Sequence, residues 1–495
     1  MENLASPLTQ LLPLLLLAAC GQQSTPVAAR TITGTCLFTF WSDDGSTTTY
    51  AGCANTEITS SGLDGAGLWE QLSSTVLGAN GFSVPAPAGD CLLGVKYPNF
   101  AYWEFFETSM STFALGANVV ARPNAVIPTQ QTVATFSLDG FDPWDVNDFL
   151  ELTSSGGGTF SELVSPFGGG NVVPMGATSA VVSFDWYGSG SRLPDGTQGD
   201  IVYVHQVATL PLPGADRSYQ TATRFVSLPP TLAVANGTTQ SVTATLGPVA
   251  QTGSLSVDWR TSSFEQHQAE INPNATGIQH ALRVDANPHS LSNRPHLEPG
   301  SPDMLVLSVP PGTLDLTLDE SPYGQFLPQF WVEYRLIFFT AGLSVTAPGA
   351  FEPGLFIGGI GRYDPLPDVT GPVTPVVTPP LSPEINGLDA FAGPAGVGTS
   401  PTVSWSPPAI GAPTSYVVLV SQPVESATGG TTFLNIAYIT TTGTSVSVPP
   451  GLLEPGVTYV AAITADMKNP DTSESAPYQL SYPYAYASAI VAFTP

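Results

Sequence analysis

Positive charge is the scarcest property of this chain. Its 495 residues contain 12 Lys and Arg against 39 Asp and Glu, which gives a formal net charge of −27. Only two lysines are present, Lys96 and Lys468. Nucleic-acid binding requires clustered positive charge that displaces counterions from phosphates, and an anionic membrane surface repels an acidic protein. The sequence therefore predicts no nucleic-acid partner and a well-solvated acidic surface.

Charged residues of both signs make up only 10% of the chain, whereas hydrophobic residues make up 42%. The 49 Gly and 48 Pro together approach a fifth of the sequence. A chain this apolar is not a disordered tail, and one this rich in turn formers is not a helical bundle. We therefore expect an all-β, multidomain protein of β-sandwich units, with room for about three or four domains.

An apolar run near the start of the chain, Leu8 to Ala19, is too short to span a bilayer and is typical of a signal-peptide core. It ends in Leu-Ala-Ala-Cys-Gly at residues 17–21. This resembles the lipobox of bacterial lipoproteins, in which small residues precede the cysteine that becomes lipidated and N-terminal. The resemblance implies a signal peptide over 1–19 and a lipidated tether over 20–30 that begins at Cys20. It also implies a place in the bacterial cell envelope, on the outer membrane or cell surface. The basic residues usual before the apolar run are absent here.

Export would place the other three cysteines in an oxidising compartment, where disulfides persist. An Asp44-Gly45 hairpin turn pairs residues whose numbers sum to 89, so Cys36 and Cys53 would face each other at a distance that a disulfide accepts. We therefore predict a Cys36–Cys53 bridge. Cys91 is then a free thiol, expected to act as a small buried hydrophobic residue.

The chain divides at changes in composition. We expect a cysteine-containing, β-rich N-terminal region over 31–125, with one helix between Asp64 and Leu77, and a central β-sandwich region of one or two units over 126–363. Residues 364–383 are rich in Pro, Thr and Val. Prolines at this density cannot sustain a sheet ladder, so this segment is predicted to be an extended linker.

Residues 384–495 contain a short strand pattern ending at Trp405, a second that starts near Tyr416, and a Pro-Gly pair between Leu453 and Tyr459. In this order and spacing they resemble a fibronectin type III domain. The resemblance implies an immunoglobulin-like two-sheet sandwich with these four residues in its structural core. It also implies that the tyrosine hydroxyl bonds to the backbone upstream. Such a module is normally a spacer or a binding platform.

Two clusters contain groups that bind metal ions. Asp139, Asp142, Asp145 and Asp148 surround Trp144 in one segment, and carboxylate oxygens are calcium ligands. The same residue types are usual in turns, and Trp144 beside acidic groups would also suit a sugar-stacking site.

The second cluster is formed by His267, His280, His289 and His296. Imidazoles bind zinc and other transition metals, but the spacings of 13, 9 and 7 residues match no compact zinc motif. Solvated loop histidines are the alternative interpretation. No cofactor is therefore assigned, and calcium and zinc both stay open.

Catalytic motifs are not evident. The chain contains no Gly-x-Ser-x-Gly elbow, no P-loop and no strand-linked dinucleotide-binding glycine pattern. We therefore expect a lipid-anchored, non-catalytic binding or structural protein of the cell envelope, with an envelope protein or a glycan as its ligand. Two alternatives stay open. One is an envelope hydrolase that acts on glycans or peptides through Asp or Glu of the central region, and the other is a metal-binding lipoprotein.

Overall fold

The computed structural model of the chain describes residues 30–41, 46–51, 56–63, 69–73, 75–77, 80–87, 89–96, 102–116, 118–165, 171–189, 191–212, 217–228, 232–287, 302–328, 331–366, 371–468 and 484–495. Strands dominate these residues, so the chain is an all-β, multidomain protein. The short helices are α1 (Trp186–Ser189), α2 (Thr261–Glu265), α3 (Gln268–Ile271) and the 3-10 turns η2 (Gly196–Gln198) and η5 (Ala390–Ala392). No helix in the described ranges is long and apolar enough to cross a membrane.

The first unit is a sandwich of two sheets. One sheet contains β1 (Arg30–Trp41), β2 (Thr47–Ala51), β5 (Thr75–Leu77), β6 (Gly81–Ala86), β9 (Thr112–Leu115) and β10 (Asn118–Val120). The other contains β3 (Glu57–Leu63), β4 (Trp69–Ser73), β7 (Cys91–Lys96) and β8 (Trp103–Thr108). The helix expected between Asp64 and Leu77 is wrong. β4 and β5 occupy the described part of that segment because each pairs with a neighbouring strand, β3 and β6 respectively.

The second unit has its own core and two layers. Its outer sheet contains β11 (Val133–Asp139), β14 (Ser179–Asp185) and β17 (Thr239–Thr245). The facing strands are β12 (Phe149–Ser154), β13 (Thr159–Val164), β15 (Tyr203–Pro211), β16 (Ser218–Ser227) and β18 (Gly247–Pro248). Phe136, Leu152 and Trp186 are buried together between the layers. The period-two burial of β11 follows from alternating apolar and hydroxyl side chains along its sequence.

The third unit repeats this arrangement. Its outer sheet contains β19 (Gly253–Trp259), β22 (Leu316–Tyr323) and β25 (Pro372–Val373). The facing strands are β20 (Thr276–Asn287), β21 (Asp303–Val309), β23 (Val332–Val345) and β24 (Gly354–Pro365). Trp259, Leu282 and Ile337 are fully buried in its core. The central region therefore holds two layered units, each with a separate outer sheet.

The fourth unit is a sandwich at the C-terminal end of the chain. One sheet contains β26 (Leu381–Ile385), β27 (Leu388–Asp389), β28 (Thr402–Ser406) and β31 (Ser445–Ser447). The other contains β29 (Ser415–Glu425), β30 (Thr431–Thr441), β32 (Tyr459–Met467) and β33 (Ala485–Phe493). Trp405, Tyr416, Leu453 and Tyr459 are all buried. The Tyr459 hydroxyl accepts a hydrogen bond from the Glu454 amide at 3.0 Å, which ties the start of β32 to the preceding turn.

Strands from all four units belong to one 17-stranded sheet. The pairwise registers give the order β13, β12, β15, β16, β21, β20, β23, β24, β33, β32, β29, β30, β8, β7, β3 and β4, with β18 beside β16. Three pairings cross unit boundaries: β16 with β21, β24 with β33, and β30 with β8. The last is parallel and joins strands more than 300 residues apart in sequence, Trp103–Thr108 and Thr431–Thr441.

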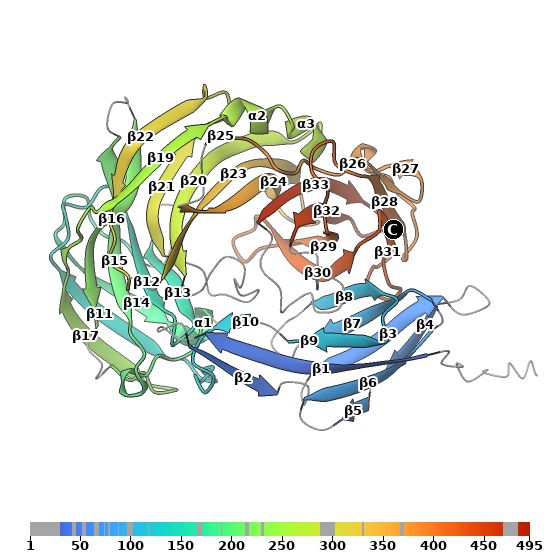
Figure 1. The fold of residues 1–495 in the computed structure, drawn as a ribbon, viewed down its shortest axis with the longest axis horizontal. Coiled ribbons are helices and arrows are strands. Elements are labelled where there is room, and N and C mark those ends of the chain that lie inside the picture. Colours follow the sequence, from blue (N-terminus) through green and yellow to red (C-terminus); the bar gives the residue numbers. More distant parts are fainter. Residues whose placement is uncertain are drawn as a thin grey trace, which may run out of the picture.

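The units follow one another around a ring, which is visible in Figure 1. Besides its pairing with the fourth unit, the first unit contacts the second through the end of β1. The Arg192 guanidinium of the second unit lies 5.3 Å from the centre of the Phe40 ring. The first unit therefore contacts both the second and the fourth.

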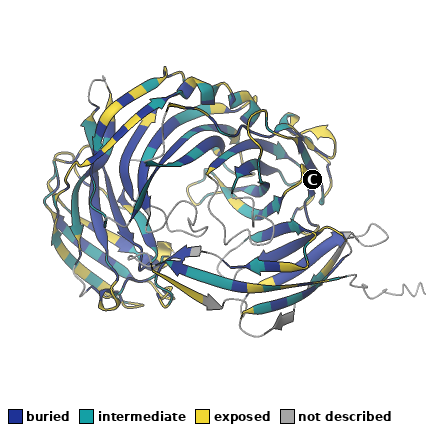
Figure 2. Ribbon diagram, viewed as in Figure 1, coloured by how far each residue is buried: buried dark blue, intermediate teal, exposed yellow. Residues whose placement is uncertain are grey.

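The smaller sheets cover the long sheet. Figure 2 shows buried residues concentrated along the strands of the long sheet and exposed residues concentrated on the outer layer. On β8 the two faces have different partners. Phe106 packs in one core with Phe113 of the first unit, whereas Phe105 and Trp103 pack with the core that contains Trp405 of the fourth.

The proline-rich segment predicted to be an extended linker is described over residues 364–366 and 371–383, and the second stretch is packed into the protein. β25 pairs with β19, and Val373 and Val377 are fully buried, as is Thr378. β26 begins at Leu381, inside the predicted linker. The interpretation as a spacer is wrong there because valines between the prolines supply apolar surface that the cores of the third and fourth units bury.

Candidate functional site

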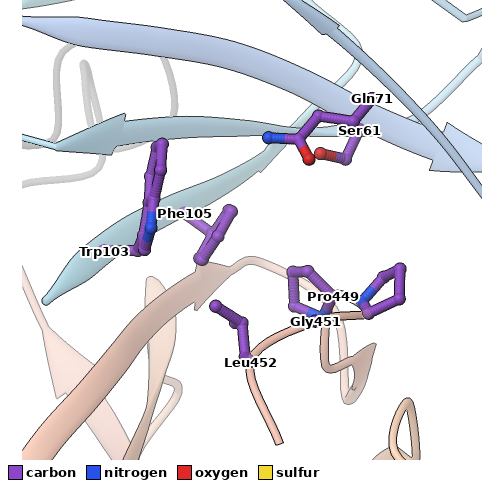
Figure 3. A pocket seen from close by; sticks show the side chains of 8 residues that line it. Ser61, Gln71, Trp103, Phe105, Pro449, Gly451 and Leu452 are labelled. Atoms are coloured by element: carbon purple, nitrogen blue, oxygen red, sulfur yellow. The ribbon is translucent and has the colours of Figure 1, made fainter.

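A pocket of about 250 Å³ lies between the first and fourth units. It is lined by Ser61, Gln71, Trp103, Phe105, Pro449, Pro450, Gly451 and Leu452. Figure 3 shows the two aromatic side chains from β8 on one side, the turn from the fourth unit on the other, and the polar side chains above them. Among the described residues that line it, none is charged.

The first unit supplies the aromatic and polar walls. Trp103 and Phe105 are two residues apart on β8, so both project from the same face, with ring centres 5.7 Å apart and planes 22° from parallel. Ser61 on β3 is the cross-strand partner of Gln71 on β4, which places a hydroxyl and an amide side by side.

The fourth unit supplies the opposite wall through the turn that follows β31. Pro449 and Pro450 fix the backbone φ angles there, and Gly451 has φ +85°, a conformation that favours glycine. The Val448 amide donates to the Pro401 carbonyl at 2.9 Å and so ties the turn to the sandwich. The wall is held by the fold of the unit and by restricted backbone angles.

Charge near the pocket is sparse. The ammonium of Lys96 lies 5.7 Å from the centre of the Trp103 ring, a cation–π distance. On the opposite face of β8, burial raises the pKa of Glu104 to about 8. Burial also raises the pKa of Tyr102, whose ring lies 4.9 Å from that of Tyr438. Glu104 is therefore mainly protonated at neutral pH and adds little negative charge to this strand.

A second group of polar residues is buried where the second and third units meet. Nε2 of His205 lies 2.8 Å from Oε2 of Glu151, and both side chains are fully buried. The Asp303 amide donates to the same Glu151 oxygen at 3.1 Å. Arg283 donates through Nε to Asp303 at 2.9 Å and lies 3.7 Å from Asp285. We call these five residues the buried ionic network.

Burial dominates the titration of the buried ionic network. It raises the pKa of Glu151 to about 7, and burial together with the Glu151 charge raises the pKa of Asp303 to about 7. Burial lowers the pKa of His205 to about 3. For Arg283, burial lowers the pKa, but the charges of Asp303 and Asp285 outweigh it and the pKa is raised. Three carboxyl groups thus share one cation, and protons are retained near neutral pH.

The buried ionic network links units rather than lining the pocket of Figure 3. Glu151 and His205 belong to β12 and β15 of the second unit, whereas Arg283 and Asp303 belong to β20 and β21 of the third. The pairing of β16 with β21 spans only two residue pairs, so the network supplies additional contacts at this junction.

The four aspartates predicted as calcium ligands are distributed among separate partners. Asp142 pairs with Arg224 at 2.7 Å. Asp148 is buried and accepts hydrogen bonds from the Gln206 side chain at 2.9 Å and the Thr209 amide at 3.0 Å. These contacts occupy oxygen atoms that a metal site would use.

The other two aspartates lie at the surface, Asp139 at the end of β11 and Asp145 in a turn. Asp139 and Asp145 are exposed, and Asp145 accepts from the Asn147 amide at 3.1 Å, as aspartates in turns commonly do. Trp144 is only 4% exposed and packs on Phe141, so the sugar-stacking interpretation of Trp144 is wrong. Within the described ranges, no three His, Cys, Asp or Glu side chains come together as a metal site would require.

Two of the four predicted metal-binding histidines are described. His267 lies 2.8 Å from Glu270, and His280 is fully buried 3.4 Å from Glu265. The histidines therefore have different carboxylate partners, and His280 is not a solvated loop residue. The remaining two lie outside the described residues, so the four-histidine metal site stays a prediction.

The hairpin predicted around Asp44-Gly45 has the expected strands but a different register. β1 and β2 are antiparallel, with Trp41 opposite Thr47, so paired residue numbers sum to 88 rather than 89. The predicted alignment is wrong by one residue because five residues, 42–46, connect the last pair instead of a two-residue turn.

The predicted disulfide itself stays a prediction, because Cys53 lies outside the described residues. Cys36 is fully buried. Cys91 is free and 3% exposed, and burial raises the pKa of its thiol, so it has no activated thiolate character. Cys20 also lies outside the described residues, and its lipidation stays a prediction.

Sequence reasoning missed the pocket. The aromatic alternation at Trp103 and Phe105 was visible as a strand, but an aromatic residue at every second position is equally typical of a core strand. Ser61 and Gln71 carry no distinctive pattern. The parallel pairing of β8 with β30 brings the two units together, and no pattern in the sequence of either strand predicts this pairing.

Comparisons with known proteins add little to this picture. No protein-family model and no curated protein sequence matches the chain. Among solved structures, a Streptococcal ancillary pilin matches at 12% identity over 66% of this chain and 95% of its own, with a TM-score of 0.13. A tetra-tandem repeat from the extending region of a large adhesion protein matches at 11% identity, over 93% and 99%, with a TM-score of 0.12. The N-terminal four Ig domains of Dscam1 isoform 4.44 match at 9% identity, over 94% and 99%, with a TM-score of 0.11. These scores are too low to support a conclusion about function.

Proposed function

We propose that this protein is a lipid-anchored, non-catalytic binding protein of the bacterial cell envelope, displayed on the outer membrane or cell surface. The observation that carries the proposal is the pocket between the first and fourth units, together with the edge pairing that holds its walls. The pairing of β8 with β30 sets the aromatic wall of the first unit against the fourth unit, whose turn after β31 of the smaller sheet forms the opposite wall. A preformed pocket between two units joined by strand pairing suits binding, because little ordering accompanies ligand entry.

The fourth unit supports a fibronectin type III-like assignment. Its two sheets group β26, β28 and β31 against β29, β30, β32 and β33. The hydroxyl of Tyr459 accepts from the Glu454 amide, which is the backbone contact expected for a tyrosine corner. In this proposal the module serves as one wall of the pocket, beyond the spacer role usual for such domains.

The alternatives receive less support. A hydrolase of the central region would need carboxyl groups that reach a substrate. Glu151 and Asp303 have raised pKa values, but both are buried at the junction of two units and are engaged by His205 and Arg283. A metal-binding lipoprotein would need converging ligands, and none converge within the described ranges. The geometry therefore favours a binding role.

The anchor is tested by replacing the cysteine of the Leu-Ala-Ala-Cys-Gly segment. Expressed in a bacterium fed radiolabelled palmitate, the full chain is expected to incorporate label and to collect in the membrane fraction. Cys20→Ala removes the thiol that the lipid would modify, so incorporation is expected to disappear. Gln23→Ala, three residues further along the tether, is the matched control and should keep its label. Label on the Cys20→Ala chain, or none on the unsubstituted chain, would reject the anchor.

A further inference from the structure

We propose that the pocket between the first and fourth units binds a neutral sugar ring of an envelope glycan. This inference deepens the proposed function. It rests on that function because a cell-envelope location is what brings the pocket into contact with envelope glycans. The pocket residues that would make the contacts are Trp103, Phe105, Gln71, Ser61 and the proline turn at 449–450.

The size and the charge of the pocket limit which ligands can bind. At about 250 Å³ the pocket is below the usual range of drug-sized sites, so it accommodates about one ring-sized group. None of the lining residues that the structure describes is charged, although the chain carries a formal charge of −27. A neutral ligand needs no oppositely charged residue in the pocket. It is also not repelled over long range by the acidic surface. An anionic ligand would meet that repulsion, although the Lys96 ammonium lies against the Trp103 ring.

The pocket has an apolar wall and a polar wall, and a sugar ring has apolar C–H faces and polar hydroxyl groups. The apolar wall of Trp103, Phe105 and Leu452 matches the C–H faces of a pyranose, and aromatic rings pack well against such faces. The hydroxyl of Ser61 and the amide of Gln71 lie side by side on paired strands. Together they offer both donors and acceptors to ring hydroxyl groups.

An extended peptide is the main competitor, and the strand pairing disfavours it. A peptide that adds to a sheet needs a strand with a free backbone edge. β8 is paired on one side with β7 and on the other with β30, and β3 is paired with both β4 and β7. Recognition at the β8 and β3 floor of the pocket therefore proceeds through side chains, which suits a sugar better than a peptide backbone.

The experiment uses the chain from Gly21 onward, which keeps every described residue. Binding is measured by isothermal titration calorimetry and saturation-transfer NMR. The neutral probes are trimers of N-acetylglucosamine, glucose and mannose, the acidic probe is a galacturonic acid trimer, and the peptide probe is deca-proline. Trp103→Ala and Gln71→Ala are the pocket variants, and Tyr187→Ala, an exposed aromatic on the second unit, is the matched control. Gln71 is exposed, so its variant should fold even if Trp103→Ala does not.

At least one neutral trimer is expected to bind, with affinity nearly independent of salt. Trp103→Ala should weaken binding about tenfold or more through loss of ring packing, Gln71→Ala about threefold or more through loss of hydrogen bonds, and Tyr187→Ala not at all. Lys96→Met should leave neutral binding nearly unchanged. Four outcomes would overturn the inference. They are no saccharide binding, binding that survives both pocket variants, binding of deca-proline alone, and salt-sensitive binding of the acidic trimer alone that Lys96→Met abolishes. None of these changes the palmitate result, so the anchor proposal stands or falls separately.

Discussion

The Gly324→Ala variant is expected to unfold at markedly lower denaturant than the unsubstituted chain. Gly324 follows β22 in the third unit, and a Cβ atom there would lie 2.0 Å from the carbonyl oxygen of Ala222 on β16 of the second unit. The Gly324 amide also donates to the Thr221 hydroxyl at 2.9 Å. The clash is with backbone, which cannot rotate away, so the two units must separate locally. We expect a loss of about 3 kcal/mol in the free energy of unfolding.

Urea denaturation followed by tryptophan fluorescence measures this loss. Gly430→Ala is the matched control, because neither glycine has a positive φ angle and the nearest atom to a Cβ at Gly430 is the Ser426 hydroxyl at 3.7 Å, an ordinary contact. That variant should unfold close to the unsubstituted chain. Equal midpoints for the two alanine variants would contradict the close approach of the second and third units.

The Arg283→Met variant is expected to be destabilised by about 3–5 kcal/mol at pH 8, because it removes the cation from the buried ionic network. Asp303 and Asp285 would lose their shared partner, and Glu151 would lose a nearby positive charge. Methionine is flexible and replaces the aliphatic stem of the arginine without its guanidinium, so the loss reports mainly on charge. Arg260→Met is the control, since Arg260 forms ion pairs at the surface, and its variant should change stability little.

The loss in Arg283→Met should shrink at lower pH. Glu151 and Asp303 have folded-state pKa values near 7, above those of the unfolded chain, so the folded state holds protons that the unfolded state has lost. The stability linked to these two groups is present at low pH and falls as pH rises through about 7. Removing Arg283 raises both pKa values further, so the deficit grows above pH 7 and is smallest near pH 5. Urea midpoints at pH 5, 6.5 and 8 measure it, and a pH-independent deficit would show that the carboxyl groups are not coupled to Arg283.

How much of this fold the sequence predicts depends on how local the signal is. Strand content follows from turn formers between β-branched runs, and the strand near Trp405 and the turn before Tyr459 follow from short spacings. These features depend on residues close in the chain, where periodicity and turn chemistry are readable. The hairpin between β1 and β2 was predicted with its register shifted by one residue, because several loop lengths fit the same Asp-Gly pair.

The strand pairings that join the four units depend on contacts between segments distant in sequence. These pairings were not predicted from the sequence. Nothing around Thr440 indicates a parallel partner at Phe106, because an edge strand and a paired strand have similar compositions when both faces are covered. The proline-rich segment was predicted to be a linker because its composition does not show whether its valines are buried. Proline density excludes a long ladder, but it does not exclude burial of Val373 and Val377 in a neighbouring core.

The buried ionic network was also unforeseen. Glu151 and His205 lie in strands whose other side chains are uncharged, and a charged residue in such a strand normally marks the solvent face. Here the opposite face of the long sheet is covered as well, so polar residues on it are buried and must pair with one another. The calcium hypothesis failed for the converse reason. The carboxylates at 139–148 are close in sequence, but they have separate partners in the structure.

The central claim is that the four units share one sheet through edge pairing. Hydrogen exchange followed by mass spectrometry on the soluble chain tests it most directly, because amides bonded across a junction exchange slowly and those on a free edge exchange quickly. Peptides covering Trp103–Phe106 of β8 and Ala437–Thr440 of β30, the residues paired across the junction, should be protected to the same degree as β32, whose two edges are paired inside the fourth unit. Fast exchange of about half the amides in these two stretches, with β32 fully protected, would show that both are edge strands and that the units are separate domains.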